Sequence, residues 1–346
     1  MVIVMEAGAS PEQIQRVMER IKSLGYEPHP MYGVERTVIG AIGDERGKSV
    51  LESLISREGV ESVIPILKPF KLASREMRPE ATIVQIGGIQ VGHGGFALIA
   101  GPCSVESETQ IIQAAVQVKE AGANMLRGGA FKPRTSPYSF QGLEHEGLKL
   151  LAKARQETGL AVVTEVLSPE DAGLVAEYAD VLQVGARNMQ NFSLLKKLGK
   201  INRPILLKRG MMCTVKEALM CAEYILSSGN PSVILCERGI RTFEDATRNT
   251  LDLAAVSLLK DWSHLPVIVD PTHGTGVKSL ILPMSKAAIA AGADGLMVEV
   301  HPKPEEALSD GFQALLPKQF KEIVKSIGPY LKLEGKQVHR PTAASG

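Results

Sequence analysis

The sequence predicts an α/β protein in which a (β/α)8 barrel, or TIM barrel, follows a small ferredoxin-like α+β domain. From residue 96 onward, eight short apolar runs recur, with gaps long enough for a helix between them. Near-continuous apolar runs are typical of buried parallel strands, and eight such β-α units match a closed barrel. The first 68 residues instead follow a β-α-β-β-α-β pattern, which is the ferredoxin-like arrangement. The length of 346 residues also favours about two domains.

The first domain is predicted over residues 1–68. A short apolar strand at 2–5 leads to Ser10 and Pro11, a pair typical of a helix start. Apolar residues at helical spacing continue this helix until Gly25. The pattern is completed by strands at 26–32 and 36–42, a helix at 47–56 and a last strand at 60–67.

The rest of the chain divides into a connector, the barrel and a tail. Residues 69–95 are basic and irregular, and they end in a hairpin that turns at Gly87 and Gly88. The catalytic barrel is predicted over 96–333, and the polar tail 334–346 is expected to be disordered. A doubly wound sheet is disfavoured because no GxGxxG motif follows the first strand. The barrel strands are predicted at 97–101, 123–127, 160–164, 180–184, 204–208, 232–236, 265–269 and 295–299.

Composition excludes several classes of function. The formal net charge is +1 and aromatic residues make up 4%, which disfavours nucleic-acid binding. No apolar run reaches the roughly 18 residues of a membrane span, and Glu6 interrupts the only apolar stretch at the start. The four cysteines form no CxxC pair, which fits a reducing compartment. We therefore expect a cytoplasmic protein that acts on small molecules.

Metal-binding side chains follow three apolar runs that become neighbours once the barrel closes. In such barrels the active site lies at the carboxyl ends of the strands. Cys103 follows the first run, His273 follows the seventh, Glu299 ends the eighth, and Asp310 lies in the loop after it. A thiolate, an imidazole and two carboxylates suit a divalent first-row metal, whereas calcium and magnesium prefer oxygen alone. The alternative is that Cys103 is a small buried residue and His273 a hydrogen-bonded loop residue.

Positively charged side chains form a second group, at the ends of the second, fourth, fifth and sixth strands. Arginine binds phosphate and carboxylate groups bidentately, so this group predicts more than one anionic small molecule. The metal would then polarise a carbonyl group or activate a water molecule beside them. Any one of these cations could equally be a solvated surface residue. The group comprises Arg127, Lys132, Arg134, Arg187, Lys208, Arg209 and Arg238.

Long motifs that contain these residues resemble type I 3-deoxy-D-arabino-heptulosonate 7-phosphate (DAHP) synthases, in the subgroup with an N-terminal ferredoxin-like regulatory domain. The resemblance covers about residues 1–332 and rests on GPCSVES, RGGAFKPRTSPYSFQG, GARNMQNF, LLKRG, CERGIRTFE, VDPTHGTG and VEVHP. It implies condensation of phosphoenolpyruvate with erythrose 4-phosphate and release of phosphate. This reaction is the first step of the shikimate route to aromatic amino acids.

The resemblance also implies roles for individual residues. One divalent ion, Mn, Fe, Co or Zn, would be bound by Cys103, His273, Glu299 and Asp310. Lys132 is the expected proton carrier, and Cys103 and His273 are also expected to be catalytic. Phosphoenolpyruvate would be bound by Arg127, Lys132, Arg187, Lys208 and Arg238. Erythrose 4-phosphate would be bound by Arg134, Thr135 and Ser136. Glu165 and His301 are expected to order water or substrate hydroxyls, and His301 is an alternative metal ligand because it lies two residues after Glu299 on the same strand face.

Two alternative functions are disfavoured. A 3-deoxy-D-manno-octulosonate 8-phosphate synthase typically has KANRSS where this chain has KPRTS, and it normally lacks the first domain. A non-catalytic metabolite sensor would be expected to lack Cys103, Lys132 or His273, and all three are present.

The first domain is expected to be a regulatory lid that binds an aromatic amino acid, in a homotetramer. The other interpretation is a dimerisation or solubility module. Met31 lies near the expected effector and offers no hydroxyl group.

Overall fold

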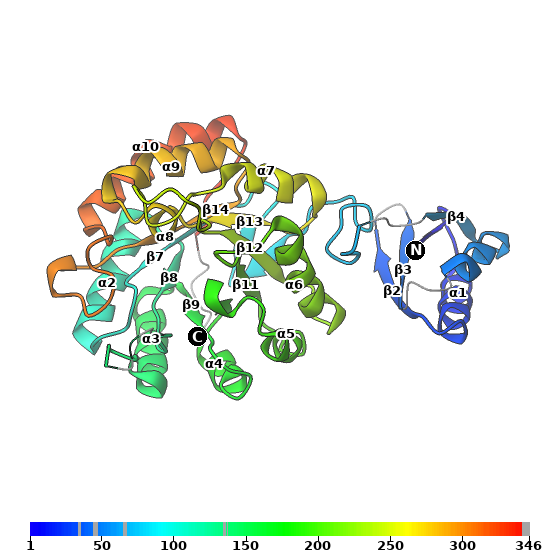
Figure 1. Cartoon of the computed structure of the whole chain (residues 1–346), viewed down its shortest axis with the longest axis horizontal. Helices are drawn as coiled ribbons and strands as arrows, with labels where there is room; N and C mark the ends of the chain where they lie inside the picture. The colour runs from blue at the N-terminus through cyan, green and yellow to red at the C-terminus, as the bar shows by residue number, and fades with distance from the viewer. Residues whose placement is uncertain (34–35, 44–47, 65–67, 134–135, 137, 341–346) are drawn as a thin grey trace. The chain divides into compact units, whose positions relative to one another are not determined.

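The computed structural model describes residues 1–33, 36–43, 48–64, 68–133, 136 and 138–340. The chain forms two compact units (Figure 1). One unit comprises Met1–Glu80 with Trp262–His264, and the other comprises Ala81–Asp261 with Leu265–Gly346. Within the described ranges, no helix combines the length and the apolar character needed to cross a bilayer.

The first unit contains a four-stranded antiparallel sheet with the order β2-β3-β1-β4. Ser10 caps the first helix and forms a capping box with Gln13, as its sequence context predicts. Ile3, Ile21 and Ile39 pack in the core between sheet and helix. The predicted helix at 47–56 is a 3₁₀ helix at 48–56. The elements are β1 (Val2–Met5), α1 (Pro11–Ser23), β2 (Glu27–Tyr32), β3 (Thr37–Ile42), η1 (Lys48–Ser56) and β4 (Val60–Ile64).

The predicted barrel is confirmed: in the part of the chain that the structure describes, eight parallel strands close into a ring. The last strand pairs with the first, from Gly295 opposite Ala97 to Glu299 opposite Gly101. This pairing makes the ends of the first, seventh and eighth strands neighbours. The strands are β7 (Ala97–Gly101), β8 (Met125–Arg127), β9 (Ala161–Glu165), β10 (Val181–Val184), β11 (Ile205–Lys208), β12 (Val233–Glu237), β13 (Val267–Val269) and β14 (Gly295–Glu299).

Helices surround these strands, as is usual for this fold (Figure 1). The short helix α8 begins directly after β13 and carries His273. The other helices are α2 (Glu108–Ala121), α3 (Glu144–Thr158), α4 (Ala172–Tyr178), α5 (Phe192–Leu198), α6 (Val215–Ser227), α7 (Leu253–Trp262), α9 (Lys278–Ala290) and α10 (Pro317–Leu333), and α8 spans Pro271–Thr275. Short 3₁₀ turns occur at η2 (Ala186–Asn188) and η3 (Pro304–Glu306).

A hairpin of β5 (Val84–Ile86) and β6 (Ile89–Val91) precedes the barrel. Gly87 and Gly88 have φ values of 50° and 81°, which is the left-handed region that such a turn needs. The apolar side chains of the hairpin belong to the same core cluster as Ala97 and Ile99 of β7. The hairpin therefore extends the barrel core.

Part of the tail is ordered, in contrast to the predicted disorder from residue 334. The Gln337 N–H donates to the Gly94 carbonyl at 2.8 Å, and the Phe96 N–H donates to the Gln337 carbonyl at 2.8 Å. The Asn124 amide donates to the His339 carbonyl at 3.0 Å. The tail is ordered here because the backbone of Gln337 satisfies the hydrogen bonds of Gly94 and Phe96, which precede β7. Residues 341–346 lie outside the described ranges.

Candidate active site

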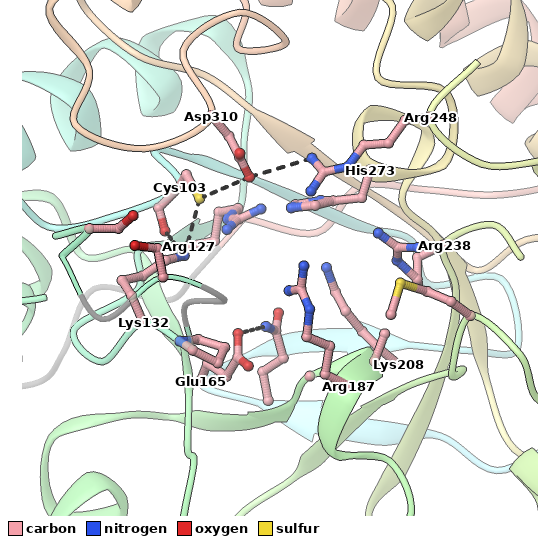
Figure 2. Close-up of a pocket in the computed structure, with 17 residues that line it drawn as sticks. Cys103, Arg127, Lys132, Glu165, Arg187, Lys208, Arg238, Arg248, His273 and Asp310 are labelled. Carbon is pink, nitrogen blue, oxygen red and sulfur yellow. Dashed lines mark hydrogen bonds and ion pairs between the residues drawn. The ribbon is translucent and has the colours of Figure 1, made fainter. Parts of the chain in front are cut away.

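A cavity of about 310 Å³ lies at the carboxyl ends of the barrel strands (Figure 2). Its volume suits small ligands. Among the predicted residues, the cavity lining includes Cys103, Arg127, Lys132, Ser136, Glu165, Arg187, Lys208, Arg238, His273 and Asp310. Arg134 and Thr135 lie outside the described residues.

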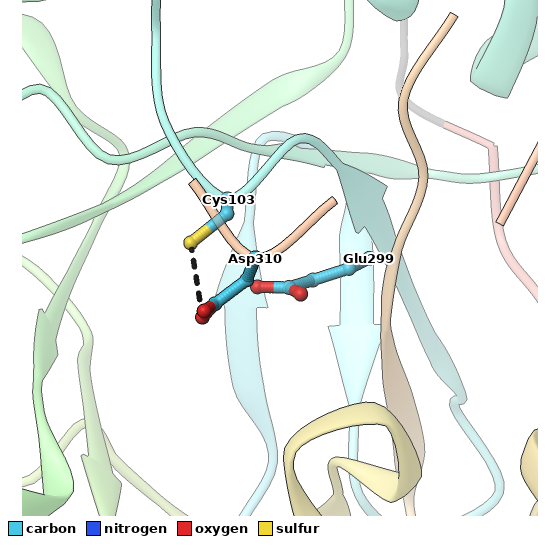
Figure 3. A group of neighbouring side chains, drawn as sticks. All are labelled: Cys103, Glu299 and Asp310. Carbon is cyan, nitrogen blue, oxygen red and sulfur yellow. Dashed lines mark hydrogen bonds between the residues drawn. The ribbon is translucent and has the colours of Figure 1, made fainter. Parts of the chain in front are cut away.

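Three of the four predicted metal ligands lie together (Figure 3). The ligand atoms of Cys103, Glu299 and Asp310 lie within 4.8 Å of one another. The Cys103 Sγ is 3.6 Å from Asp310 Oδ2. Each of the three comes from the end of β7 or β14 or from the loop after it, which is why barrel closure brings them together.

The donor set fits a divalent cation. Glu299 is fully buried, and its Oε1 forms no hydrogen bond with any described residue. This oxygen lies 3.2 Å from Arg127 and 3.1 Å from His273 Nε2, but neither contact has hydrogen-bond geometry. A buried carboxylate oxygen without a hydrogen bond, next to a thiol and a second carboxylate, is a suitable ligand for a first-row metal.

His273, the fourth predicted ligand, lies beside this group rather than within it. Its Nδ1 is 2.7 Å from Asp270 Oδ2, and its Nε2 faces Glu299 at 3.1 Å. A carboxylate that accepts a hydrogen bond from Nδ1–H leaves Nε2 as the atom that would bind a metal in exchange for its proton. Asp270 therefore orients the ring of His273 toward Glu299.

The charges of neighbouring side chains shift the pKa values of His273 and Glu299, and in both cases they favour the charged form. Burial disfavours the charged form of His273, but the carboxylates of Asp270 and Glu299 outweigh it and raise the pKa to about 9. Burial likewise opposes ionisation of Glu299, yet His273 and Arg127 lower its pKa. The carboxylates of the site are thus held as anions by neighbouring cations.

Lys132 connects the cationic group with the candidate metal site. Its Nζ donates to the Cys103 carbonyl at 2.9 Å and lies 3.1 Å from Cys103 Sγ. The Ser309 hydroxyl lies 3.0 Å from the same sulfur. A Cβ atom at Gly129 would lie 2.8 Å from the Cys103 carbonyl and 2.8 Å from the Lys132 side chain, so glycine is required for this approach.

The remaining cations line the opposite side of the cavity (Figure 2). Lys208 forms a buried ion pair with Asp270, with 2.5 Å between Nζ and Oδ2. Desolvation lowers the pKa of the buried Arg238, which carries its charge on the cavity wall. At Glu165, the Gln183 amide donates a hydrogen bond at 3.1 Å. Among the described residues, six Lys and Arg side chains line the cavity: Arg127, Lys132, Arg187, Lys208, Arg238 and Arg248.

Three of the described predicted residues do not line the cavity: Glu299, which is fully buried beside it, Arg209 and His301. Arg209 forms ion pairs with Glu237 and Asp252, each at 2.9 Å, so it is a structural cation. His301 was expected to face the substrates, but its Nε2 lies 3.4 Å from Glu106. Its Nδ1 accepts a hydrogen bond from the Lys303 N–H. After Glu299 the backbone pairs with the segment around Leu315, and the His301 side chain contacts Glu106 instead of entering the cavity.

Two residues of the site were missed by the sequence analysis. Arg248 lines the cavity, and its NH1 is 3.5 Å from Asp310 Oδ2. Gln313 is fully buried and donates to Glu299 Oε2 at 2.6 Å. Both residues lie in long irregular loops, at a distance from the strand ends, and no motif identified them.

Comparison with known proteins follows the same division of the chain. The model of the DAHP synthetase I family matches residues 74–332, and that of the DAHP synthase ferredoxin-like domain matches residues 1–68. Phospho-2-dehydro-3-deoxyheptonate aldolase of Thermotoga maritima is 53% identical over 327 residues, which cover 94% of this chain and 96% of the relative. A 2-dehydro-3-deoxyphosphooctonate aldolase of Syntrophotalea carbinolica is 32% identical over 254 residues, which cover 68% of this chain and 91% of the relative.

Two solved structures are also similar. The crystal structure of the Thermotoga maritima phospho-2-dehydro-3-deoxyheptonate aldolase (DAHP synthase) has a TM-score of 0.78 and 51% identity, and the match covers 98% of this chain and 99% of that chain. A truncated form of 3-deoxy-D-arabino-heptulosonate 7-phosphate synthase from Thermotoga maritima has a TM-score of 0.72 and 50% identity, over 78% of this chain and 98% of that chain. From the matched family models and the 53% identical relative, the chain belongs to the DAHP synthetase I family.

Proposed function

We propose that this chain condenses phosphoenolpyruvate with erythrose 4-phosphate to give DAHP and inorganic phosphate, the first step of the shikimate pathway. The observation that carries the proposal is the cavity in which six cations surround a thiol and carboxylate group. Two phosphorylated substrates, one with a carboxylate, need such an excess of positive charge to lie side by side. The family of the chain and the name of its Thermotoga maritima relative support the same reaction.

The cations would divide between the two substrates. Arginine and lysine groups that converge from four strands hold the phosphate and carboxylate of the first substrate in one orientation. We assign phosphoenolpyruvate to Arg127, Lys132, Arg187, Lys208 and Arg238. We assign erythrose 4-phosphate to Arg134, Thr135 and Ser136.

A divalent metal would be held by Cys103, Glu299, Asp310 and the Nε2 atom of His273. When bound, it would supply Lewis-acid polarisation of the aldehyde carbonyl of erythrose 4-phosphate. Mn, Fe, Co and Zn all accept this mixture of sulfur, nitrogen and oxygen ligands. Asp270 would keep His273 in the required tautomer through Nδ1.

Lys132 is the proposed proton carrier. Its ammonium group lies at the border between the cations and the metal ligands, where both substrates would meet. Glu165, held by Gln183, would order water or a substrate hydroxyl on the other side of the cavity.

The first domain is proposed to be regulatory. We propose that it binds an aromatic amino acid as feedback inhibitor, that the protein is a homotetramer and that it works in the cytoplasm. The match of residues 1–68 to the ferredoxin-like domain of DAHP synthases supports a role linked to this enzyme.

The proposal is tested by measuring phosphate release from phosphoenolpyruvate with each of two aldehydes. Erythrose 4-phosphate should support turnover, and arabinose 5-phosphate should support much less. A preference for arabinose 5-phosphate would favour the activity named for the Syntrophotalea carbinolica relative. No release with either aldehyde, in protein loaded in turn with each of the four metals, would favour a non-catalytic sensor.

A further inference from the structure

Gln313 is a fully buried amide that touches the candidate metal site but belongs to neither predicted group of residues. We propose that Gln313 is a positioning residue that orients the Glu299 carboxylate for the metal and links it to Arg248. The inference rests on the proposed function, because it takes a bound metal as given.

The backbone around Gln313 is fixed beside the end of β14. The Leu315 N–H donates to the Glu299 carbonyl at 2.9 Å, and the His301 N–H donates to the Leu315 carbonyl at 2.9 Å. These bonds continue the parallel pairing of the barrel by a short segment after Glu299. Gln313 lies in a turn two residues before this paired segment, and its N–H donates to the Asp310 carbonyl at 3.1 Å, so its backbone is held at both sides.

The chemistry of its neighbours determines how the amide is oriented. Its Nε2 lies 2.6 Å from Glu299 Oε2, and its Oε1 lies 2.8 Å from Arg248 NH1. A carboxylate can only accept and a guanidinium can only donate, so exchanging the nitrogen and oxygen of the amide would lose both bonds. The amide is thus restricted to one orientation by two charged partners.

This orientation leaves one oxygen of Glu299 for an ion. Oε2 is occupied by the amide, whereas Oε1 is the buried oxygen that forms no hydrogen bond with a described residue. A carboxylate without the amide could rotate about its last bond toward Arg127 or His273, which lie 3.2 Å and 3.1 Å from Oε1. Oε1 already lies in ion contact with these two cations, so Gln313 opposes only the rotation of Glu299 that would turn these contacts into hydrogen bonds.

The same amide also connects the two carboxylates of the site. Arg248 NH1, held by Gln313 Oε1, lies 3.5 Å from Asp310 Oδ2. The chain Glu299–Gln313–Arg248–Asp310 thus joins two of the three clustered ligands through one neutral amide and one guanidinium. Partners of this kind around metal ligands typically contribute a factor of about 10 to 100 in metal affinity.

The test compares metal affinity in the wild type, Gln313→Met and the control Gln117→Met. Gln117 lies on α2, its Oε1 is buried without a partner among the described residues, and the change in side chain is the same. Affinity for Co²⁺ and Zn²⁺ is measured by competition with a chelating dye. We expect roughly 10- to 100-fold weaker binding and altered cobalt absorption bands in Gln313→Met, with both unchanged in Gln117→Met.

A second variant, Gln313→Glu, covers the case in which Gln313→Met does not fold. When ionised, it keeps the shape but cannot donate to Glu299, and its negative charge alone would strengthen cation binding. Weaker metal binding in this variant therefore reports lost orientation of Glu299.

Metal binding as tight as in the wild type in folded Gln313→Met, or unchanged cobalt absorption bands in Gln313→Glu where Gln313→Met does not fold, would overturn the inference and leave the proposed function standing. A wild type that binds neither ion would overturn the inference together with the metal site of the proposed function.

Discussion

The Lys132 ammonium group lies 3.1 Å from the sulfur of Cys103. This contact joins the cationic group and the candidate metal ligands, which the sequence predicts as separate groups. Lys132 lies on the loop after β8 and Cys103 on the loop after β7, so the parallel pairing of these two neighbouring strands brings them together. Because the two side chains have different chemistry, their loss should affect the protein in different ways.

Lys132→Met should lower turnover by a factor of about 10² to 10⁴, because positive charge and proton transfer are lost together. Metal content should stay at the wild-type level. Phosphate release and metal content after dialysis are the measurements, and Lys196→Met, on the exposed side of α5, is the control. A loss smaller than tenfold would contradict the role of Lys132.

Cys103→Ala should lose bound metal and activity together, because the thiolate is one of the clustered ligands. The melting temperature should change little, because the substitution removes one buried atom. Cys221→Ala removes the same atom from α6 and should keep both metal and activity. Equal metal content in the two variants would show that Cys103 is not a ligand.

Glu106→Ala should weaken metal binding by about tenfold, because Glu106 ties the loop after β7 to the loop that carries Asp310. Its Oε1 accepts hydrogen bonds from the Leu308 N–H and the Ser104 hydroxyl, each at 3.0 Å. Hydrogen exchange should become faster at 305–312. The control is Glu108→Ala, since Glu108 is exposed and pairs only with Lys153 among the described residues. Unchanged exchange in Glu106→Ala would contradict this role.

A chain that begins at Arg78 should keep phosphate release and lose inhibition by Tyr and Phe. No lining residue of the cavity precedes Cys103 among the described residues, and a truncated Thermotoga maritima relative matches 78% of this chain. An inhibitor that changes the ratio of inhibited to active protein from 1:99 to 99:1 must bind the inhibited state more favourably by about 5 kcal/mol. Inhibition that is equal in both chains, or absent from the full chain, would leave the domain without the proposed regulatory role.

The stability of the full chain should fall below pH 6.5 through His264. Its side chain is buried and donates to the Leu72 carbonyl at 2.7 Å, and desolvation lowers its pKa from 6.5 to about 4. The unfolded chain then binds more protons than the folded chain as the pH falls from 6.5 to 4, so acid favours unfolding. At pH 5 the loss from this group is about 2 kcal/mol.

The prediction for His264 is checked by calorimetry at pH 7 and pH 5. His264→Gln keeps a donor for the Leu72 carbonyl but cannot titrate, so its melting temperature should fall less between the two pH values. An equal fall in the wild type and in the variant would show that other groups cause the acid sensitivity.

Much of the fold and of the candidate metal site could be predicted from the sequence. Apolar runs identify the buried strands of a parallel barrel, and the topology of a closed barrel makes its first and last strands neighbours. Cys103, Glu299 and Asp310 follow those strands, so local pattern and topology together were enough to group them. Ser10 and the Gly87–Gly88 turn were predictable because helix caps and tight turns depend on neighbouring residues alone.

Tertiary structure alone decided which polar side chains enter the site. Lys208 and Arg209 are adjacent, yet only Lys208 lines the cavity, because successive side chains at a strand end point in opposite directions. Arg248 reaches the site because its backbone N–H bonds to the Thr275 carbonyl at 2.8 Å, beside the helix of His273. Gln313 is placed by pairing next to Glu299. Contacts between distant loops depend on the packing of the whole barrel, and local sequence carries no periodic signal for them.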